Sequence, residues 1–254
     1  MLSSRQEYQI MYEAEGQLWW YKILHEKILN AITSKFADNK KIKILDAGCG
    51  TGGLMQLLIK QGYVNIEGFD YSDDAVDFCK ERKLNVQKID LTDFNAEFED
   101  ASFDVIINDD VLYQFEDEVI VKAIKNMERK LKPDGMLISN NNAFQIFYGT
   151  HDMAVGGVKR FTISDFEKYL LPTNLKIIHH TYWSLFLSPL ILGVRLLQQF
   201  QLKFNLVDRT AIKSDVSVPG NFVNNALYKI VKLEEQLFRR GIFGSSLFLI
   251  MVKK

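Results

Sequence analysis

The sequence has few cysteines and no apolar leader at its start. Cys49 and Cys79 are the two cysteines in 254 residues. Two cysteines do not make the disulfide framework of a small secreted protein, so we expect both to be reduced thiols. Arg5, Glu7 and Glu13 interrupt any apolar stretch near the N-terminus, which argues against a signal peptide. We therefore expect a cytoplasmic protein.

Long apolar runs and an excess of basic residues are also missing. The longest apolar run, residues 183–194, ends at Arg195 and is shorter than the roughly 20 residues that cross a bilayer. The formal net charge is −1, so the sequence offers no basic stripe for nucleic acid. These two absences argue against a membrane-spanning protein and against a nucleic-acid partner.

Two common catalytic signatures are absent as well. The sequence has no Gly-x-Ser-x-Gly motif and no spaced cluster of histidines and cysteines. We therefore expect neither a serine hydrolase nor a metal-dependent enzyme. Hydrophobic residues make up 47% of the chain, which is enough for one large core. The length suits one domain, with room for an inserted cap.

A glycine-rich turn follows the first apolar strand, at residues 46–53 (DAGCGTGG). Gly48 and Gly50 let the backbone turn tightly and approach a ligand without Cβ atoms in the way. Asp46 places a carboxylate at the carboxyl end of this strand. Asp70 ends a second apolar strand and would lie beside the same crevice, where a carboxylate commonly binds a ribose diol. The pattern predicts a site for a nucleoside-containing ligand.

The turn also satisfies the dinucleotide pattern G-x-G-x-x-G, through Gly48, Gly50 and Gly53. An NAD-dependent oxidoreductase is therefore an alternative. A dinucleotide would bring an anionic pyrophosphate near Asp46, which would repel it. A cationic ligand carrying an ammonium and a sulfonium would instead be attracted. Asp90 ends a third strand and adds a polar group where an adenine could lie.

Five segments in this order carry a family resemblance: 46–52 (DAGCGTG), 70–72 (DYS), 90–91 (DL), 102–107 (SFDVII) and 131–137 (LKPDGML). Through them the chain resembles the class I S-adenosylmethionine-dependent methyltransferases over about residues 40–182, and again in the last strand. The segment 18–21 (LWWY) is similar to one in a bacterial small-molecule methyltransferase subgroup. A catalytically silent relative that only binds the cofactor is a further alternative.

The resemblance implies an α/β fold with a doubly wound, mostly parallel seven-stranded sheet, which is Rossmann-like and carries a helical cap. We expect a single domain over 1–254, with an N-terminal helical cap (1–39), a cofactor-binding core (40–182), a helical cap insert (183–244) and a last strand (245–254). The last strand would be antiparallel and inserted between strands five and six. Apolar spacing predicts helices over 4–36, 116–132, 189–201 and 221–240, with Pro133 and Gly241 ending the second and fourth.

By the same resemblance, S-adenosylmethionine would contact eleven residues: Trp20, Asp46, Gly48, Cys49, Gly50, Asp70, Tyr71, Asp90, Leu91, Asn108 and Asp109. The acceptor would lie near Trp19, Tyr21 and Tyr113. His151 would remove a proton from an acceptor hydroxyl, or would be an exposed loop histidine. Since Trp19, Trp20 and Tyr21 cannot all face one way on a helix, we expect one or two of them in the core. Relatives often carry a histidine where Gln114 stands.

The acceptor is expected to be a small, fairly apolar metabolite or a lipid-linked intermediate, methylated on oxygen or nitrogen. Lys159 and Arg160 would hold an acidic acceptor or pair with surface carboxylates. The apolar segment 183–204 has three interpretations: a lid over the acceptor, a dimer contact, or a helix on a membrane surface. A monomer and a homodimer both fit the sequence, and peripheral membrane contact is the less favoured interpretation.

Overall fold

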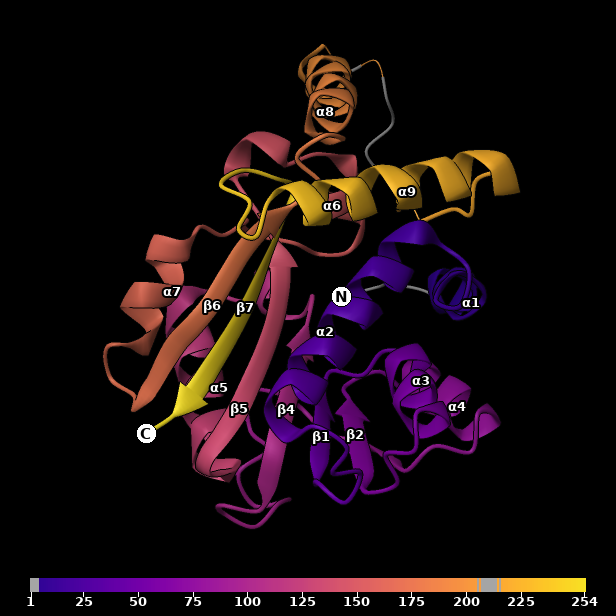
Figure 1. Ribbon diagram of the computed structural model, residues 1–254. Coiled ribbons are helices and arrows are strands. Elements are labelled where there is room, and N and C mark those ends of the chain that lie inside the picture. The colour runs from indigo at the N-terminus through magenta and orange to yellow at the C-terminus, as the bar shows by residue number, and fades with distance from the viewer. Residues whose placement is uncertain (1–4, 205, 207–213, 215) are drawn as a thin grey trace.

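The computed structural model describes residues 5–204, 206, 214 and 216–254 (Figure 1). Its centre is a seven-stranded sheet in the order β3-β2-β1-β4-β5-β7-β6. The strands are β1 (Ile44–Ala47), β2 (Ile66–Asp70), β3 (Val86–Lys88), β4 (Phe103–Asp109), β5 (Leu131–Asn142), β6 (Leu175–Trp183) and β7 (Ser246–Lys253). β1 to β5 pair in parallel, and β7 is antiparallel to β5 and β6. This arrangement confirms the predicted fold, including the inserted last strand.

Helices lie on both faces of the sheet and above its carboxyl edge (Figure 1). They are α1 (Arg5–Ala14), α2 (Trp19–Phe36), α3 (Gly53–Lys60), α4 (Asp73–Glu81), α5 (Asp117–Lys130), α6 (Thr150–Ala154), α7 (Ile163–Leu170), α8 (Ser188–Lys203) and α9 (Asn221–Leu237). Short 3₁₀ turns occur at η1 (Leu112–Gln114) and η2 (Gln145–Phe147). Among the residues described, no helix combines the length and apolarity needed to cross a membrane.

The alternation of side chains along β4 shows how the sheet separates two cores. Ile106 packs with α5 and α7 in one buried cluster. Val105 and Ile107 pack with α2 and α3 in the other cluster. Because successive side chains of a strand point to opposite faces, an apolar run is needed where both faces are covered. The apolar strand predicted over 103–108 is thus explained.

The predicted helix over 4–36 is wrong in one respect: the chain forms two helices. α1 ends at Ala14 and α2 begins at Trp19. Glu15 lies between them and is buried against Arg82, the residue that follows α4. A buried ion pair with a residue far along the chain fixes this turn, and helix periodicity carries no information about such a partner.

Two predicted helix ends also differ from the structure. α5 ends at Lys130, and Pro133 lies in β5, where the pairing with β4 jumps from Phe103–Leu131 to Val105–Met136. At that irregularity, Pro133 does not interrupt the regular hydrogen-bond ladder. α9 ends at Leu237 rather than at Gly241. The Gly241 amide instead donates to Thr181 Oγ1 at 2.9 Å.

Candidate functional site

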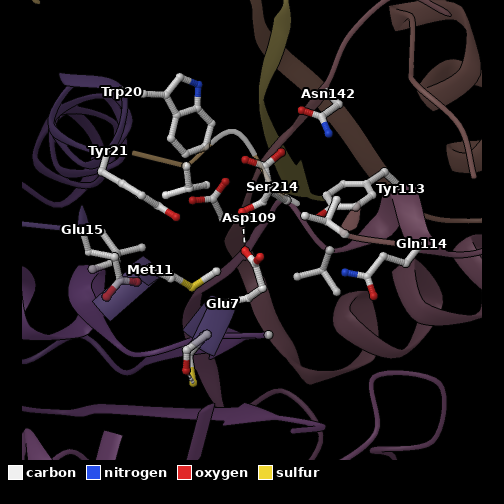
Figure 2. A pocket seen from close by; sticks show the side chains of 18 of the residues that line it. Glu7, Met11, Glu15, Trp20, Tyr21, Asp109, Tyr113, Gln114, Asn142 and Ser214 are labelled. Atoms are coloured by element: carbon white, nitrogen blue, oxygen red, sulfur yellow. Dashed lines mark hydrogen bonds between the residues drawn. The ribbon is translucent and has the colours of Figure 1, made fainter. Parts of the chain in front are cut away.

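A cavity of about 500 Å³ opens at the carboxyl ends of β1, β2 and β4, and residues of α1, α2 and α8 also line it. Figure 2 shows part of its lining. Its lining combines predicted cofactor residues with predicted acceptor residues. Fourteen of the fifteen residues proposed from the sequence line it: Trp19, Trp20, Tyr21, Asp46, Gly48, Cys49, Gly50, Asp70, Tyr71, Asp90, Leu91, Asp109, Tyr113 and His151. These residues therefore surround one cavity.

The glycine turn after β1 has the backbone conformation that its sequence predicts. Gly48 and Gly50 have φ values of 89° and 54°, in the left-handed region that favours glycine. The amides of Gly48 and Cys49 both donate to the carbonyl of Phe69, at 2.9 and 3.0 Å. These two hydrogen bonds join the turn to β2 and leave its other edge facing the cavity.

Asp70 connects the glycine turn to the start of α4. Its Oδ2 accepts from the Gly50 amide at 3.0 Å, and its Oδ1 accepts from the Ser72 amide at 2.9 Å. Burial raises the pKa of Asp70, while these amides lower it. Each oxygen keeps a further lone pair, since a carboxylate has about four acceptor positions. Asp70 can therefore accept hydroxyl hydrogens from a ligand without losing its place in the fold.

Asp46 is almost fully buried at the end of β1. Burial, and then the nearby charges of Glu15 and Asp70, together raise the pKa of Asp46 to about 8. The carboxyl is therefore protonated at neutral pH unless a positive charge lies beside it. A cationic ligand would supply that charge.

Asp90 lies at the cavity and also closes its own turn. It lines the cavity, and its Oδ1 also accepts from the Thr92 amide at 2.8 Å, which closes its own turn. Leu91 beside it is buried. The roles of Asp90 and Leu91 toward an adenine ring stay predictions.

Asn108 is the one predicted site residue that is not among the cavity-lining residues. It is fully buried, and its Nδ2 donates to the carbonyl of Ala47 at 2.7 Å. This hydrogen bond fixes the end of β4 against the end of β1. Asn108 thus supports the glycine turn from within the sheet.

Asp109 and Asp110 bring two carboxyl groups to the cavity from the end of β4. Figure 2 shows Asp109 in the cavity. Asn140 donates to Asp110 Oδ2 at 3.0 Å and accepts from the indole of Trp183 at 3.0 Å. Burial raises the pKa of Asp110 to about 7. Burial, and then the charge of Asp110, raise the pKa of Asp109 well above its usual value. At neutral pH the pair holds at least one proton, because two adjacent buried carboxylates repel each other.

The aromatic side chains at the start of α2 form one wall of the cavity. Trp19, Trp20 and Tyr21 all line it, although the sequence favoured at least one of them in the core. All three reach the cavity because it surrounds the first turn of α2. Trp20 stacks on Trp183 with ring centroids 5.7 Å apart, and Tyr21 meets the Trp20 ring edge-on at 5.1 Å. The wall is therefore largely aromatic.

His151 lies in α6 rather than in an exposed loop, and it lines the cavity. Nearby Arg160 also lines it, but its charge is balanced by buried Asp152, with Nε–Oδ1 at 2.9 Å and Nη2–Oδ2 at 3.0 Å. Lys159 pairs with exposed Asp117. The expected surface pairing thus holds for Lys159, while Arg160 makes a buried ion pair that the sequence did not indicate.

Residues of α1 and α8 complete the cavity and were missed by the sequence reasoning. α1 and the turn after it contribute Glu7, Tyr8, Met11 and Glu15, and α8 contributes Ile191 and Arg195. The hydroxyl of Ser214 donates to Glu7 within the view of Figure 2. The spacing of 8, 11 and 15 follows one helical face and was a signal that these residues share a surface.

Comparison with known proteins identifies the family. The model of a methyltransferase domain matches residues 38–169, which is more than half of the chain. The chain belongs to the methyltransferase domain family. It is a class I S-adenosylmethionine-dependent methyltransferase, and S-adenosylmethionine is its cofactor. The NAD-dependent oxidoreductase alternative is therefore excluded.

Individual relatives are distant in sequence. The ubiquinone biosynthesis O-methyltransferase of Rickettsia felis is 29% identical over 185 residues, which cover 65% of this chain and 74% of that protein. A SAM-dependent methyltransferase from Archaeoglobus fulgidus has a TM-score of 0.53 at 17% identity, over 92% of this chain and all of that one. A geranyl diphosphate C-methyltransferase from Streptomyces coelicolor, solved with S-adenosyl-L-homocysteine, has a TM-score of 0.56 at 13% identity, over 92% and 76%. The two solved structures share the fold.

Proposed function

We propose that this methyltransferase transfers the methyl group to an oxygen atom of a small, fairly apolar metabolite or lipid-linked compound. One observation carries the proposal: His151 and the aromatic wall line the same cavity as the strand-end carboxylates. The cavity can therefore hold a cofactor at one side and an apolar acceptor with an ionisable hydroxyl at the other. The relative from Rickettsia felis is named an O-methyltransferase, which supports oxygen over nitrogen.

The residues at the glycine turn fit S-adenosylmethionine. Asp70 keeps acceptor positions for ribose hydroxyls, and Gly48 has no Cβ to obstruct a close approach. The Oδ1 atoms of Asp109 and Asp110 are buried and have no hydrogen-bond partner among the described residues. Unpartnered carboxyl oxygens suit the positive charge of this cofactor. When bound, S-adenosylmethionine supplies a methyl group already activated on sulfur.

The protein then has to orient the acceptor and accept its proton. Orientation alone contributes on the order of 7–11 kcal/mol to such reactions. The rings of Trp19 and Tyr113 would hold an apolar acceptor by contact, and both line the cavity. His151 would take the hydroxyl proton as the methyl group is transferred, because imidazole accepts protons near neutral pH.

The test is transfer of a labelled methyl group to a pair of probes, an alkyl-substituted catechol and the matching alkyl-substituted aniline. We expect transfer to the catechol and at most slow transfer to the aniline. His151→Ala should lower kcat by about 10²-fold or more. His180→Ala is the control, because His180 lies in β6 and is not among the cavity-lining residues.

Three results would contradict the proposal. Transfer to the aniline alone would assign nitrogen as the acceptor atom. Equal effects of His151→Ala and His180→Ala would exclude His151 as the base. Binding of S-adenosylhomocysteine without transfer to any acceptor would support the catalytically silent alternative.

A further inference from the structure

α8 turns Arg195 and Ile191 toward the protein and most of its apolar side chains toward solvent. Arg195 is only 8% exposed, lines the cavity and donates to Gln198 at 2.7 Å. Leu197 and Phe200, on the other side of the helix, are 58% and 54% exposed. A helix on the surface of a globular protein normally buries its apolar side. α8 instead leaves most of its apolar side chains exposed, so its outer side is suited to contact something other than water.

This outer side is continuous along the helix. We call it the α8 apolar face; its members are 46–65% exposed and are Leu190, Val194, Leu196, Leu197, Phe200 and Phe204. Spacings of three and four residues place them on one side of the helix. Phe200 and Phe204 also contact each other, with ring centroids 4.5 Å apart. Contiguous exposed apolar surface of this kind marks a contact site.

Exposed large apolar side chains are concentrated in the cap segment, residues 183–244. Of 24 exposed large apolar side chains among the described residues, 16 lie in it. The segment also has eight lysines and arginines against four aspartates and glutamates, a formal charge of +4, while the whole chain has −1. Residues 183–207 contain no acidic residue. The α8 apolar face thus belongs to a segment of net positive charge in a chain whose net charge is slightly negative.

A negatively charged lipid bilayer fits this combination. Apolar side chains enter the boundary between headgroups and acyl chains, and nearby lysines and arginines are attracted to anionic headgroups. A second copy of the chain fits less well, because a symmetric contact would bring two segments of charge +4 together. We propose that the α8 apolar face docks the enzyme on an anionic lipid bilayer.

The position of α8 relates this docking to the cavity. Ile191 and Arg195, on the inner side of the same helix, line the cavity. A bilayer bound to the outer side would therefore lie one helix diameter from the site, about 10 Å. This arrangement agrees with the apolar acceptor of the proposed function. The docking proposal itself, however, rests only on the exposed surface of α8, and vesicle binding can be measured without any acceptor.

The test is co-sedimentation of the full chain with two kinds of vesicle, pure phosphatidylcholine and a phosphatidylglycerol mixture. We expect binding to the anionic vesicles, weaker binding at high salt, and weaker binding to phosphatidylcholine. The double variant Leu197→Ser/Phe200→Ser should bind about tenfold more weakly or worse, because two buried apolar side chains are lost. Leu171→Ser is the matched control, since Leu171 is 82% exposed but lies just after α7, outside the cap segment.

Thermal stabilisation by S-adenosylhomocysteine in both variants would show that they are folded. Absence of vesicle binding by the folded wild type would overturn the proposal. An equal loss of vesicle binding in the double variant and in Leu171→Ser would also overturn it. A dimer in light scattering that the double variant dissociates, with no vesicle binding, would assign the face to a second copy instead.

Discussion

Arg82, which caps the end of α4, and Glu15, in the turn between α1 and α2, form a buried ion pair with Nη1 2.5 Å from Oε2. The same guanidinium donates to the carbonyls of Thr51 and Tyr12, at 2.8 and 2.9 Å. Thr51 belongs to the glycine turn, and its hydroxyl donates to Glu15 at 2.5 Å. One arginine therefore joins the N-terminal helices to the turn at which we place the cofactor.

Removing Arg82 should damage both stability and cofactor binding. Arg82→Met leaves Glu15 buried without its opposite charge, which costs about 3–5 kcal/mol for a broken buried pair. We expect urea unfolding to show this loss in the free energy of unfolding. We expect calorimetry to show a lower affinity for S-adenosylhomocysteine. Arg5→Met is the control, because the Arg5–Asp74 pair is largely exposed and worth about 0–1 kcal/mol. Similar losses in the two variants would show that the buried pair does not hold the turn.

Gly48 should not tolerate a side chain. Its φ is 89°, and a Cβ there would lie 2.5 Å from Cγ2 of Val111. We expect Gly48→Ala to destabilise the protein by about 1–3 kcal/mol and to weaken S-adenosylhomocysteine binding. Adding Val111→Ala should restore part of the stability, because it removes the clash but not the strained φ. Gly193→Ala is the control, since a Cβ in α8 meets nothing within 4 Å.

Asp70 is expected to bind the cofactor through its remaining acceptor positions. Asp70→Ala should weaken binding of S-adenosylhomocysteine by about tenfold or more, since hydrogen bonds to a charged group are worth about 1.5–3 kcal/mol. Asp77→Ala is the control, because it removes an exposed carboxylate of α4 that pairs with Lys80. The affinity of this variant for S-adenosylhomocysteine should match that of the wild type. Isothermal titration calorimetry measures both. Unchanged affinity in Asp70→Ala would place the ribose elsewhere.

The fold was predictable because its signals are local. The apolar run of β4 and the glycine turn are each contained in a few residues. The insertion of β7 between β5 and β6 came from the family resemblance, and its pairing confirms it. The break between α1 and α2 was not predictable, because it depends on a contact between Glu15 and Arg82, 67 residues apart.

The cavity shows the same limit. Residues at strand ends were found because parallel strands end at one edge of the sheet. The contributions of α1 and α8 were not, since they depend on how distant helices pack. For α8 the sequence showed an amphipathic helix, but a pattern alone does not tell which side faces the protein. In the structure, the side of α8 that carries Arg195 faces the protein.

Asp46 should make stability depend on pH. Its folded-state pKa is raised from 3.8 to about 8, so the folded protein holds a proton there that the unfolded chain has lost. Stability from this residue is therefore full below about pH 4 and falls as pH rises toward 8. Urea unfolding of the wild type and of Asp46→Asn measures this. The free energy of unfolding of the wild type should fall relative to that of Asp46→Asn as pH rises from about 4 to 8. A constant difference between the two free energies would contradict the raised pKa.

The same proton should couple cofactor binding to pH. A cationic ligand favours the ionised form of Asp46, so binding below about pH 8 must release its proton. We therefore expect the affinity for S-adenosylhomocysteine, which keeps the ammonium group, to rise from pH 6 to about pH 8 and then level off. Calorimetry at pH 7 in phosphate and in Tris, buffers with different ionisation enthalpies, should show proton release by the wild type and less by Asp46→Asn. Equal heats in the two buffers for the wild type would mean that Asp46 does not face the positive charge of the ligand, and its carboxyl would then serve only to pack the end of β1.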